Sequence, residues 1–562
     1  MLRRRALFGL LAAGAVVGAV LAVGIAGAAP PPGPNHTKTP IKHLVVIFQE
    51  NVSFDHYFGT YPDATNADGT PFHARFGTPR VDGLTPALRT SNPNGVNPAR
   101  LDPTNLNDLL TCDQDHDYTA EQAAVDNGKM DQFVSATGNG SGTSATGQAC
   151  TASTVMDYYD GNTVSALWNY AQHFAMSDSS FGTTYGPSSP GAINLVSGDT
   201  NGAYNLVRGA QSDVVGDGDG GYSLISDAQP YFDDCSSRDS AAMSGENVGD
   251  QLNRHGLSWG WFEGGFTPTV AYSGPASSVG TYDPTNVTGR AACGARHPIG
   301  VALGGTGQWG NKGDYIPHHE PFQYYASTAN PHHLAPTSLS AVGTDTATPG
   351  HFDTANHQYD LTWFNALVEA IHDGTTPASA LPAVSFVKAP GFQDGHAGYS
   401  DPIDEQAFLV NEINSIMALP DWSSTAIFIA YDDSDGWYDH AFPGVTNASS
   451  TPADALSGPG SCTAPGATTI LDEQGRCGLG PRLPLLLISP WARANFVDHV
   501  QSDQSSITKF VEWNWHLGQI PGSAADVAGS LNSMFDFDQT GTGAARARTL
   551  FLNPRSGAIA RR

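Results

Sequence analysis

Short apolar runs alternate with helical patterns along most of the chain. The run Leu44 to Phe48 is too short for a membrane span and too uniformly apolar for a half-exposed strand, so it predicts a buried strand of a parallel sheet. Runs of the same kind cover Leu381 to Val387, Thr425 to Tyr431 and Pro484 to Pro490. Helical patterns cover residues 53–58, 119–133, 361–371, 402–417 and 505–517. Because strands alternate with helices, the sequence predicts an α/β fold with a mainly parallel central sheet.

Two of these predicted strands end in side chains that carry ligand oxygens. Glu50 and Asn51 follow the first strand, and Asp432 and Asp433 follow the third. Ligands bind at the carboxyl edge of such sheets, and carboxylates gathered at one edge repel each other unless a cation neutralises them. These four side chains are therefore candidate ligands of a divalent metal ion. Read alone, the acidic run at 432–435 also suits a simple surface turn.

A serine lies beside a predicted helix start in the stretch Pro187-Ser188-Ser189-Pro190. Proline is favoured at the first helical position and serine at the cap. A serine placed there faces unpaired backbone N–H groups, which bind phosphate oxygens. The stretch is therefore a candidate for phosphate chemistry, and the alternative is that its serine only caps the helix.

Histidines accompany two other segments. His318 and His319 are adjacent in an aromatic stretch with a proline on each side, and His396 follows Asp394 in the loop after the strand at 381–387. Adjacent residues point apart on regular structure, so the pair serves one site only if the flanking prolines make the backbone irregular. The alternative is a pair of surface histidines.

The 562-residue chain is long enough for one large α/β domain and is strongly acidic. Its net charge of −28 and its pI near 4.8 argue against nucleic-acid binding and against attraction to anionic membranes. An anionic substrate would therefore need a strong local positive centre, which a metal ion would supply.

The first 29 residues resemble an export signal, with a basic start, an apolar run and small residues before a cleavage site near Ala28. Left uncleaved, the same run is long enough to anchor the chain in a bilayer. The sequence thus predicts export to the cell envelope or the medium, by the Sec or the twin-arginine route. After a Pro-rich linker at 30–40, it predicts one catalytic domain at 41–545, with an insertion at roughly 199–330, and a C-terminal tail at 546–562.

Six cysteines in an exported chain indicate disulfides, and fifteen pairings are possible. Each neighbouring pair brackets a Gly- and Ser-rich segment that suits a surface insertion. The predicted disulfides are therefore Cys112–Cys150, Cys235–Cys293 and Cys462–Cys477, and the alternative is six buried thiols.

Four segments carry a family resemblance: IKHLVVIFQENVSFDHYFGTYP at 41–62, GPSSPGAINLVSG at 186–198, YDDSDGWYDH at 431–440 and RLPLLLISPWAR at 482–493. Together they resemble the phosphoesterase family of bacterial phospholipases C and acid phosphatases, which also includes the plant non-specific phospholipases C. The resemblance extends from about residue 42 to 517, with the segments in the family's order. It implies an alkaline-phosphatase-like fold, a three-layer sandwich with loop-rich insertions.

The resemblance also implies a role for each candidate residue. One divalent metal ion would be bound by Glu50, Asn51, Asp432 and Asp433, and the nucleophile would be Ser188 rather than Ser189. The phosphate would be surrounded by His116, His318, His319 and His396, and His319 or His396 would protonate the leaving oxygen. Gly191 departs from the family pattern, which has Asn at this position. A backbone N–H or Asn194 would have to replace that contact to the phosphoryl oxygens.

The implied function is that of a secreted, metal-dependent phosphoric ester hydrolase of the phospholipase C type, with a phosphoserine intermediate. Its substrate would be a phospholipid head group or a small phosphate ester. The alternatives are an acid phosphatase acting on phosphomonoesters and, from a different class, a non-catalytic binding protein on the same scaffold. Oxygen ligands favour calcium, magnesium or manganese, while nearby histidines leave zinc or iron open. We expect a monomer that binds no nucleic acid and is not inserted in the membrane once the signal is removed.

Overall fold

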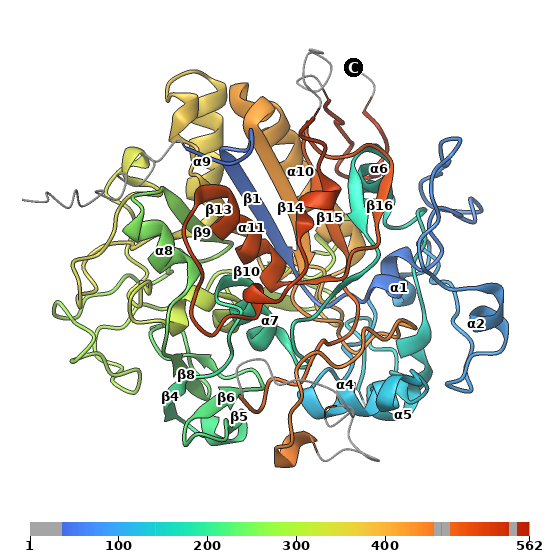
Figure 1. The fold of residues 1–562 in the computed structure, drawn as a ribbon, viewed down its shortest axis with the longest axis horizontal. Coiled ribbons are helices and arrows are strands. Elements are labelled where there is room, and N and C mark those ends of the chain that lie inside the picture. The colour runs from blue at the N-terminus through green and yellow to red at the C-terminus, as the bar shows by residue number, and fades with distance from the viewer. Residues whose placement is uncertain (1–35, 141, 455–461, 463–472, 539–547, 561–562) are drawn as a thin grey trace, which may run out of the picture.

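The centre of the molecule is an eight-stranded sheet in the order β12-β9-β13-β1-β14-β15-β2-β16 (Figure 1). The computed structural model describes residues 36–140, 142–454, 462, 473–538 and 548–560. In sheet order the strands are Gln358–Asp360, Trp259–Glu263, Val384–Lys388, His43–Gln49, Thr425–Tyr431, Leu485–Ile488, Ala175–Ser177 and Phe496–Asp498. Strand β15 is antiparallel to both neighbours, and the other pairings are parallel. The predicted α/β class and the mainly parallel sheet are confirmed.

Helices cover both faces of this sheet. The larger ones are α4 (Tyr118–Val125), α6 (Ser165–His173), α7 (Ser188–Val196), α8 (Val248–Arg254), α9 (Leu361–His372), α10 (Pro402–Met417) and α11 (Ser505–Trp515). The short ones are α1 (Phe54–Phe58), α2 (Pro86–Thr90), α3 (Leu106–Leu109) and α5 (Phe133–Ala136).

Strand β14 shows how the two helical layers are attached. Side chains alternate along a strand, and Tyr431 donates a hydrogen bond to Glu405 of α10 while Phe428 packs against Phe510 of α11. Helix α10 contacts α6 and α9, whereas α11 contacts α7. With a buried strand between two helical layers, the structure is consistent with the predicted sandwich. Its assignment to the alkaline-phosphatase superfamily remains a prediction.

The helix predicted at 119–133 is shorter than expected. Helix α4 ends at Val125, and Asp126 and Asn127 have positive φ angles of 40° and 57°. Asp and Asn tolerate the left-handed region, which a continuing helix cannot contain. The apolar residues that suggested one helix therefore belong to two helices, α4 and α5, which a turn separates.

The stretch at 199–330, predicted as an insertion, contains small sheets but also one central strand. The small strands are β4 (Ala203–Val207), β5 (Val214–Gly216), β6 (Tyr222–Leu224), β7 (Gln229–Pro230), β8 (Ser240–Met243), β10 (Arg296–Pro298) and β11 (Asn311–Gly313). The remaining pair, β3 (Ser180–Phe181) and β17 (Ser502–Asp503), lies outside this stretch. Strand β9 pairs with β13 inside the main sheet, and its Trp259 and Trp261 are fully buried. Part of the stretch thus belongs to the core.

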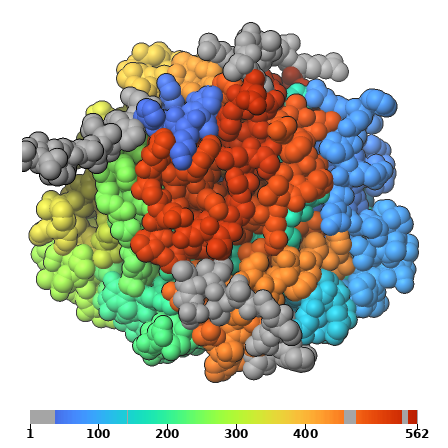
Figure 2. Space-filling view, in the orientation of Figure 1, coloured from blue at the N-terminus to red at the C-terminus, as the bar shows by residue number. Residues whose placement is uncertain are grey.

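The described part of the C-terminal tail packs against the core. Leu550 and Leu552 are buried, and the indole of Trp422 donates a hydrogen bond of 2.9 Å to the carbonyl of Arg548. In Figure 2 the part of the chain that precedes this tail, in orange-red, covers the middle of the face shown. The predicted export signal at 1–29 lies outside the described residues. Within the described ranges no helix is both long and apolar enough to cross a bilayer.

The three disulfides join Cys112 to Cys150, Cys235 to Cys293 and Cys462 to Cys477, as predicted. The Cα atoms of the pairs are 5.9, 5.7 and 5.6 Å apart, within the usual range for a disulfide.

Candidate functional site

The candidate site lies where β1 and β14 end. These strands pair in parallel from His43 and Thr425 to Gln49 and Tyr431, so the residues that follow them emerge at one edge of the sheet. Asn51 turns the chain there in the left-handed region, with a φ of 58°. Its backbone N–H donates a 2.8 Å hydrogen bond to Oδ1 of Asp432. The parallel register therefore brings the two predicted ligand pairs together.

Ser188 faces these carboxylates from the first residue of α7. Its Oγ lies 3.1 Å from Oε2 of Glu50 and 3.2 Å from Oδ2 of Asp433, and its side chain is buried. Ser189 points elsewhere, because its Oγ accepts a hydrogen bond of 3.0 Å from the hydroxyl of Tyr324. Of the two serines, Ser188 is the one that the fold places beside the carboxylates.

Gly191 is required by the close approach of α7 to β14. A Cβ atom at this position would lie 2.1 Å from the carbonyl oxygen of Asp432, so the chain has no room for the Asn of the family pattern. One N–H of Asn194 Nδ2 donates to Oγ1 of Thr184 at 3.0 Å. At the start of α7 the N–H of Ser189 donates to Oδ1 of Asp227 at 2.9 Å and Pro190 has no N–H, so the N–H of Ser188 is the backbone donor left for a phosphoryl oxygen.

The carboxylates of the site are buried and close to one another. Burial raises the pKa of Glu50 well above its usual value, and the carboxylate of Asp432 raises it further. The pKa of Asp433 is raised for the same two reasons. A cation would relieve this desolvation and repulsion.

The side chain of Lys388 supplies one such positive charge, and this residue was not identified from the sequence. Lys388, the last residue of β13, is fully buried, and its Nζ contacts Oε1 of Glu50. Burial alone would lower the pKa of Lys388, but Glu50 and Asp432 raise it above its usual value, so the amine stays charged. In the sequence, Lys388 is visible only as a lysine at the end of an apolar strand. Its position beside Glu50 follows from the pairing of β13 with β1.

The donor set also fits a divalent metal ion. Oδ1 of Asn51, Oδ2 of Asp432 and Oδ2 of Asp435 are buried without a hydrogen-bond partner among the described residues. Acceptor oxygens without donors suit a cation, and an oxygen-rich set with one hydroxyl suits a hard one. Two of the four predicted ligands, Asn51 and Asp432, have such an oxygen, and Asp435 is a further candidate, so the metal site stays a prediction.

The adjacent histidines diverge, as irregular backbone allows. They end a single 3₁₀ turn at Pro317–His319, and their rings are inclined by 87°. Nε2 of His319 lies 3.2 Å from Oε2 of Glu50, whereas Nε2 of His318 lies 3.8 Å from Oδ2 of Asp227. Only His319 touches the carboxylates that face Ser188.

His116 and His396, the other two predicted histidines, lie next to each other near Asn51 and Asp435. Nε2 of His116 lies 3.3 Å from Nδ2 of Asn51, and its Nδ1 lies 3.4 Å from Oδ1 of Asp435. The ring centres of His116 and His396 are 6.0 Å apart. His116 and His319 thus contact residues at the strand ends, and the rings of His396 and His318 lie next to them.

The charge of these histidines differs from the sequence-based expectation. Burial lowers the pKa of His318 to about 4 and of His396 to about 3, and it lowers the pKa of His319 well below the usual value. Burial also lowers the pKa of His116, but Asp433 and Asp435 outweigh it and raise this pKa well above the usual value. Of the four rings, His116 rather than His319 or His396 is the one whose pKa the surrounding carboxylates raise.

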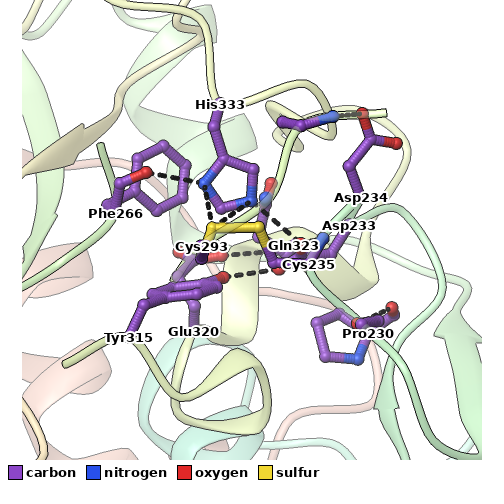
Figure 3. Close-up of polar contacts among 12 residues, drawn as sticks. Pro230, Asp233, Asp234, Cys235, Phe266, Cys293, Tyr315, Glu320, Gln323 and His333 are labelled. Atoms are coloured by element: carbon purple, nitrogen blue, oxygen red, sulfur yellow. Dashed lines mark hydrogen bonds and ion pairs between the residues drawn. A yellow bond between two sulfur atoms is a disulfide. The ribbon is translucent and has the colours of Figure 1, made fainter. Parts of the chain in front are cut away.

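A cluster of possible metal ligands that includes none of the predicted site residues is formed by Cys235, Cys293 and His333 (Figure 3). The two sulfur atoms form a disulfide. Nδ1 of His333 is 2.8 Å from the carbonyl oxygen of Phe266, and its Nε2 is 2.9 Å from Oδ1 of Asp233. All the ligand atoms of this cluster are engaged within the protein, so we assign it a structural role.

A cavity of about 650 Å³ lies at the other edge of the sheet. Its lining includes Lys42 and His43 at the start of β1 and Ala383 just before β13. Chemistry in open parallel sheets takes place at the carboxyl edge, so we place the functional site at the strand ends and not in this cavity.

The fold and the site define a class: an α/β protein with a serine at a helix start, set against carboxylates at the carboxyl edge of a parallel sheet. The chain belongs to the phosphoesterase family, and the match covers residues 41–518.

Its curated relatives include several bacterial enzymes. It is 25% identical over 516 residues to a non-hemolytic phospholipase C of Burkholderia pseudomallei, which covers 88% of this chain and 59% of that protein. It is 25% identical over 529 residues to phospholipase C A of Mycobacterium tuberculosis, which covers 91% of this chain and 79% of that protein. A 173-residue segment is 31% identical to a non-hemolytic phospholipase C of Pseudomonas aeruginosa and covers 28% of this chain and 24% of that protein. The chain thus spans less than two thirds of the Burkholderia and Pseudomonas relatives.

Proposed function

We propose that this protein is an exported, metal-dependent phosphoric ester hydrolase of the phospholipase C type that acts through a phosphoserine intermediate. The observation that carries the proposal is the position of Ser188, whose Oγ lies 3.1 and 3.2 Å from the carboxylates of Glu50 and Asp433 at the start of a nine-residue helix. The family, and the relatives named phospholipase C, support the hydrolysis of a phosphoric ester.

In the proposed reaction, each of the following residues has a separate role. Glu50 or Asp433 accepts the hydroxyl proton of Ser188, and the oxygen attacks phosphorus. The backbone N–H of Ser188 stabilises the phosphoryl oxygens. The bond from phosphorus to the leaving oxygen breaks, and that oxygen receives a proton from His116, the ring whose pKa the carboxylates raise. Water then hydrolyses the phosphoserine and frees the hydroxyl.

A divalent cation would be held by Glu50, Asn51, Asp432 and Asp433. Such an ion supplies Lewis-acid chemistry, lowering the pKa of a nearby hydroxyl and neutralising charge on phosphoryl oxygens. The buried acceptor oxygens without partners among the described residues support this assignment. The protein would act as a monomer on a phospholipid head group or a small phosphate ester, and its net charge of −28 disfavours nucleic acid.

Hydrolysis of p-nitrophenyl phosphate and p-nitrophenylphosphorylcholine tests the proposal, with and without a chelator. We expect cleavage by the metal-loaded protein and loss of activity on chelation. Ser188→Ala should lower kcat by about a thousandfold or more. Ser189→Ala is the matched control and should keep most of the activity, since Ser189 faces Tyr324. Failure of the metal-loaded protein to cleave any phosphate ester, or an active Ser188→Ala variant, would refute the assignment.

A further inference from the structure

Two cations at the edge of the site have no carboxylate partner. They are Lys312 on β11 and Arg238, which precedes β8. Among the described residues, no carboxylate oxygen lies within 4.0 Å of either side chain, whereas Arg254 has one carboxylate partner and Arg100 and Arg482 have two each. Other described basic residues, such as Arg208 and Arg296, also lack a carboxylate partner, so Lys312 and Arg238 are distinguished by their position beside the site.

Lys312 is held beside the predicted phosphate site. Its Nζ lies 3.1 Å from the centre of the Tyr399 ring. That ring is 4.2 Å from the ring of His396, and its hydroxyl is 3.4 Å from Oδ2 of Asp394. The side chain of Lys312 packs closely on the loop after β13, because a Cβ at Gly391 would lie 3.2 Å from its Cγ. The hairpin of β10 and β11 thus presents the amine to the site.

Arg238 approaches from the side of the adjacent histidines. Its Nη2 lies 3.4 Å from Nδ1 of His318. Its charge also acts on Lys312, although less than the carboxylates of Asp394, Glu50 and Asp113 do, and the charges of Arg238 and Lys312 both act on His318. The two cations therefore share one electrostatic environment beside the histidines.

This arrangement is unfavourable for a cationic head group. Quaternary ammonium groups bind to aromatic faces, and the ammonium of Lys312 already covers the face of Tyr399. A choline would lose that face and would be repelled by two positive charges. A negative group would instead find two charged donors, each able to form a strong hydrogen bond.

We propose that Lys312 and Arg238 bind the head-group side of the substrate and select phosphodiesters that carry a negative charge in addition to the reacting phosphate. This inference rests on the proposed function and names the substrate class within it. The two residues act in substrate selection, outside the bond-breaking chemistry.

Dihexanoyl phosphatidylserine and dihexanoyl phosphatidylethanolamine test the proposal, because they differ by one head-group carboxylate. We expect the metal-loaded protein to hydrolyse the serine lipid with the higher kcat/KM. Lys312→Gln and Arg238→Gln should each lower kcat/KM for the serine lipid by about tenfold, the worth of one charged hydrogen bond. The value for the ethanolamine lipid should stay within about twofold. Lys312→Arg should restore most of the preference.

Lys129→Gln is the matched control, since Lys129 is exposed and paired with Asp126. It should leave both lipids unaffected. Equal hydrolysis of the two lipids by the unaltered protein would overturn the inference while leaving the proposed function standing. An equal loss on both lipids in Lys312→Gln would assign this residue to positioning of the site and would also overturn it. If no phosphate ester is cleaved at all, the proposed function and this inference fall together.

Discussion

Replacement of Gly191 by alanine sets two effects of opposite sign against each other. The added Cβ would lie 2.1 Å from the carbonyl oxygen of Asp432, where ordinary contact begins at 3.4 Å. The two atoms must therefore separate by 3.4 minus 2.1, or about 1.3 Å. Neither a Cβ nor a backbone oxygen can rotate away, so α7 or the turn after β14 has to move.

The consequences for stability and for activity differ in size. Alanine in place of glycine stabilises a helix interior by about 1 kcal/mol, while overpacking costs about 1–3 kcal/mol. The free energy of unfolding should thus fall by no more than about 2 kcal/mol. The movement also separates Ser188 from Asp433, and a misplacement of about 1 Å can cost about a hundredfold in rate. We expect kcat/KM to fall by about that factor in a protein that still folds.

The assay is steady-state hydrolysis of whichever p-nitrophenyl substrate the protein cleaves, together with urea unfolding. Gly280→Ala is the control, because a Cβ there meets no heavy atom within 4 Å. A Gly191→Ala variant with activity within about threefold of the control would show that this close contact does not set the position of Ser188.

Two further predictions concern buried charge. Lys388→Met removes the amine that contacts Glu50, and breaking a buried ion pair costs about 3–5 kcal/mol of folding stability. Urea unfolding in the presence of a chelator should show this loss. An unchanged unfolding midpoint would contradict the pairing. His440 lies 2.6 Å from Asp55 and 3.3 Å from Asp82, with Arg482 opposing; although burial lowers its pKa, these carboxylates raise it to about 10. A raised pKa stabilises the fold fully below the unfolded value near 6.5, and this stabilisation is lost as the pH rises through about 10. The Tm should therefore fall over that range more steeply in the unaltered protein than in His440→Asn, and equal slopes would refute the assignment.

The ends of β1 and β14 show what local pattern reveals. A run of apolar residues predicts a buried strand whatever its partners are, and a change to Glu50 or Asp432 marks where burial among apolar neighbours stops. Since parallel strands finish at one edge, two such ends predict one site without knowledge of the register. The ligand candidates and the serine at the helix start were accessible in this way.

Other features depend on residues that are far apart in the sequence. Strand β9 has five residues, too few for periodicity to distinguish it from a loop, and its place is set by pairing with β13. Lys388 became part of the site because β13 lies next to β1. The raised pKa of His116 also depends on distant residues, because the carboxylates that cause it are more than 300 positions away in the sequence.

The sequence alone therefore determined the fold class, the disulfide pairs and the residue types at the strand ends, because these follow from composition, spacing and local periodicity. The tertiary structure decided which serine faces the carboxylates, why Gly191 cannot carry a side chain and which histidine has a raised pKa. It also brought Lys312 and Arg238 to the same histidine. These properties depend on distance and burial, and both arise only when separate segments pack together.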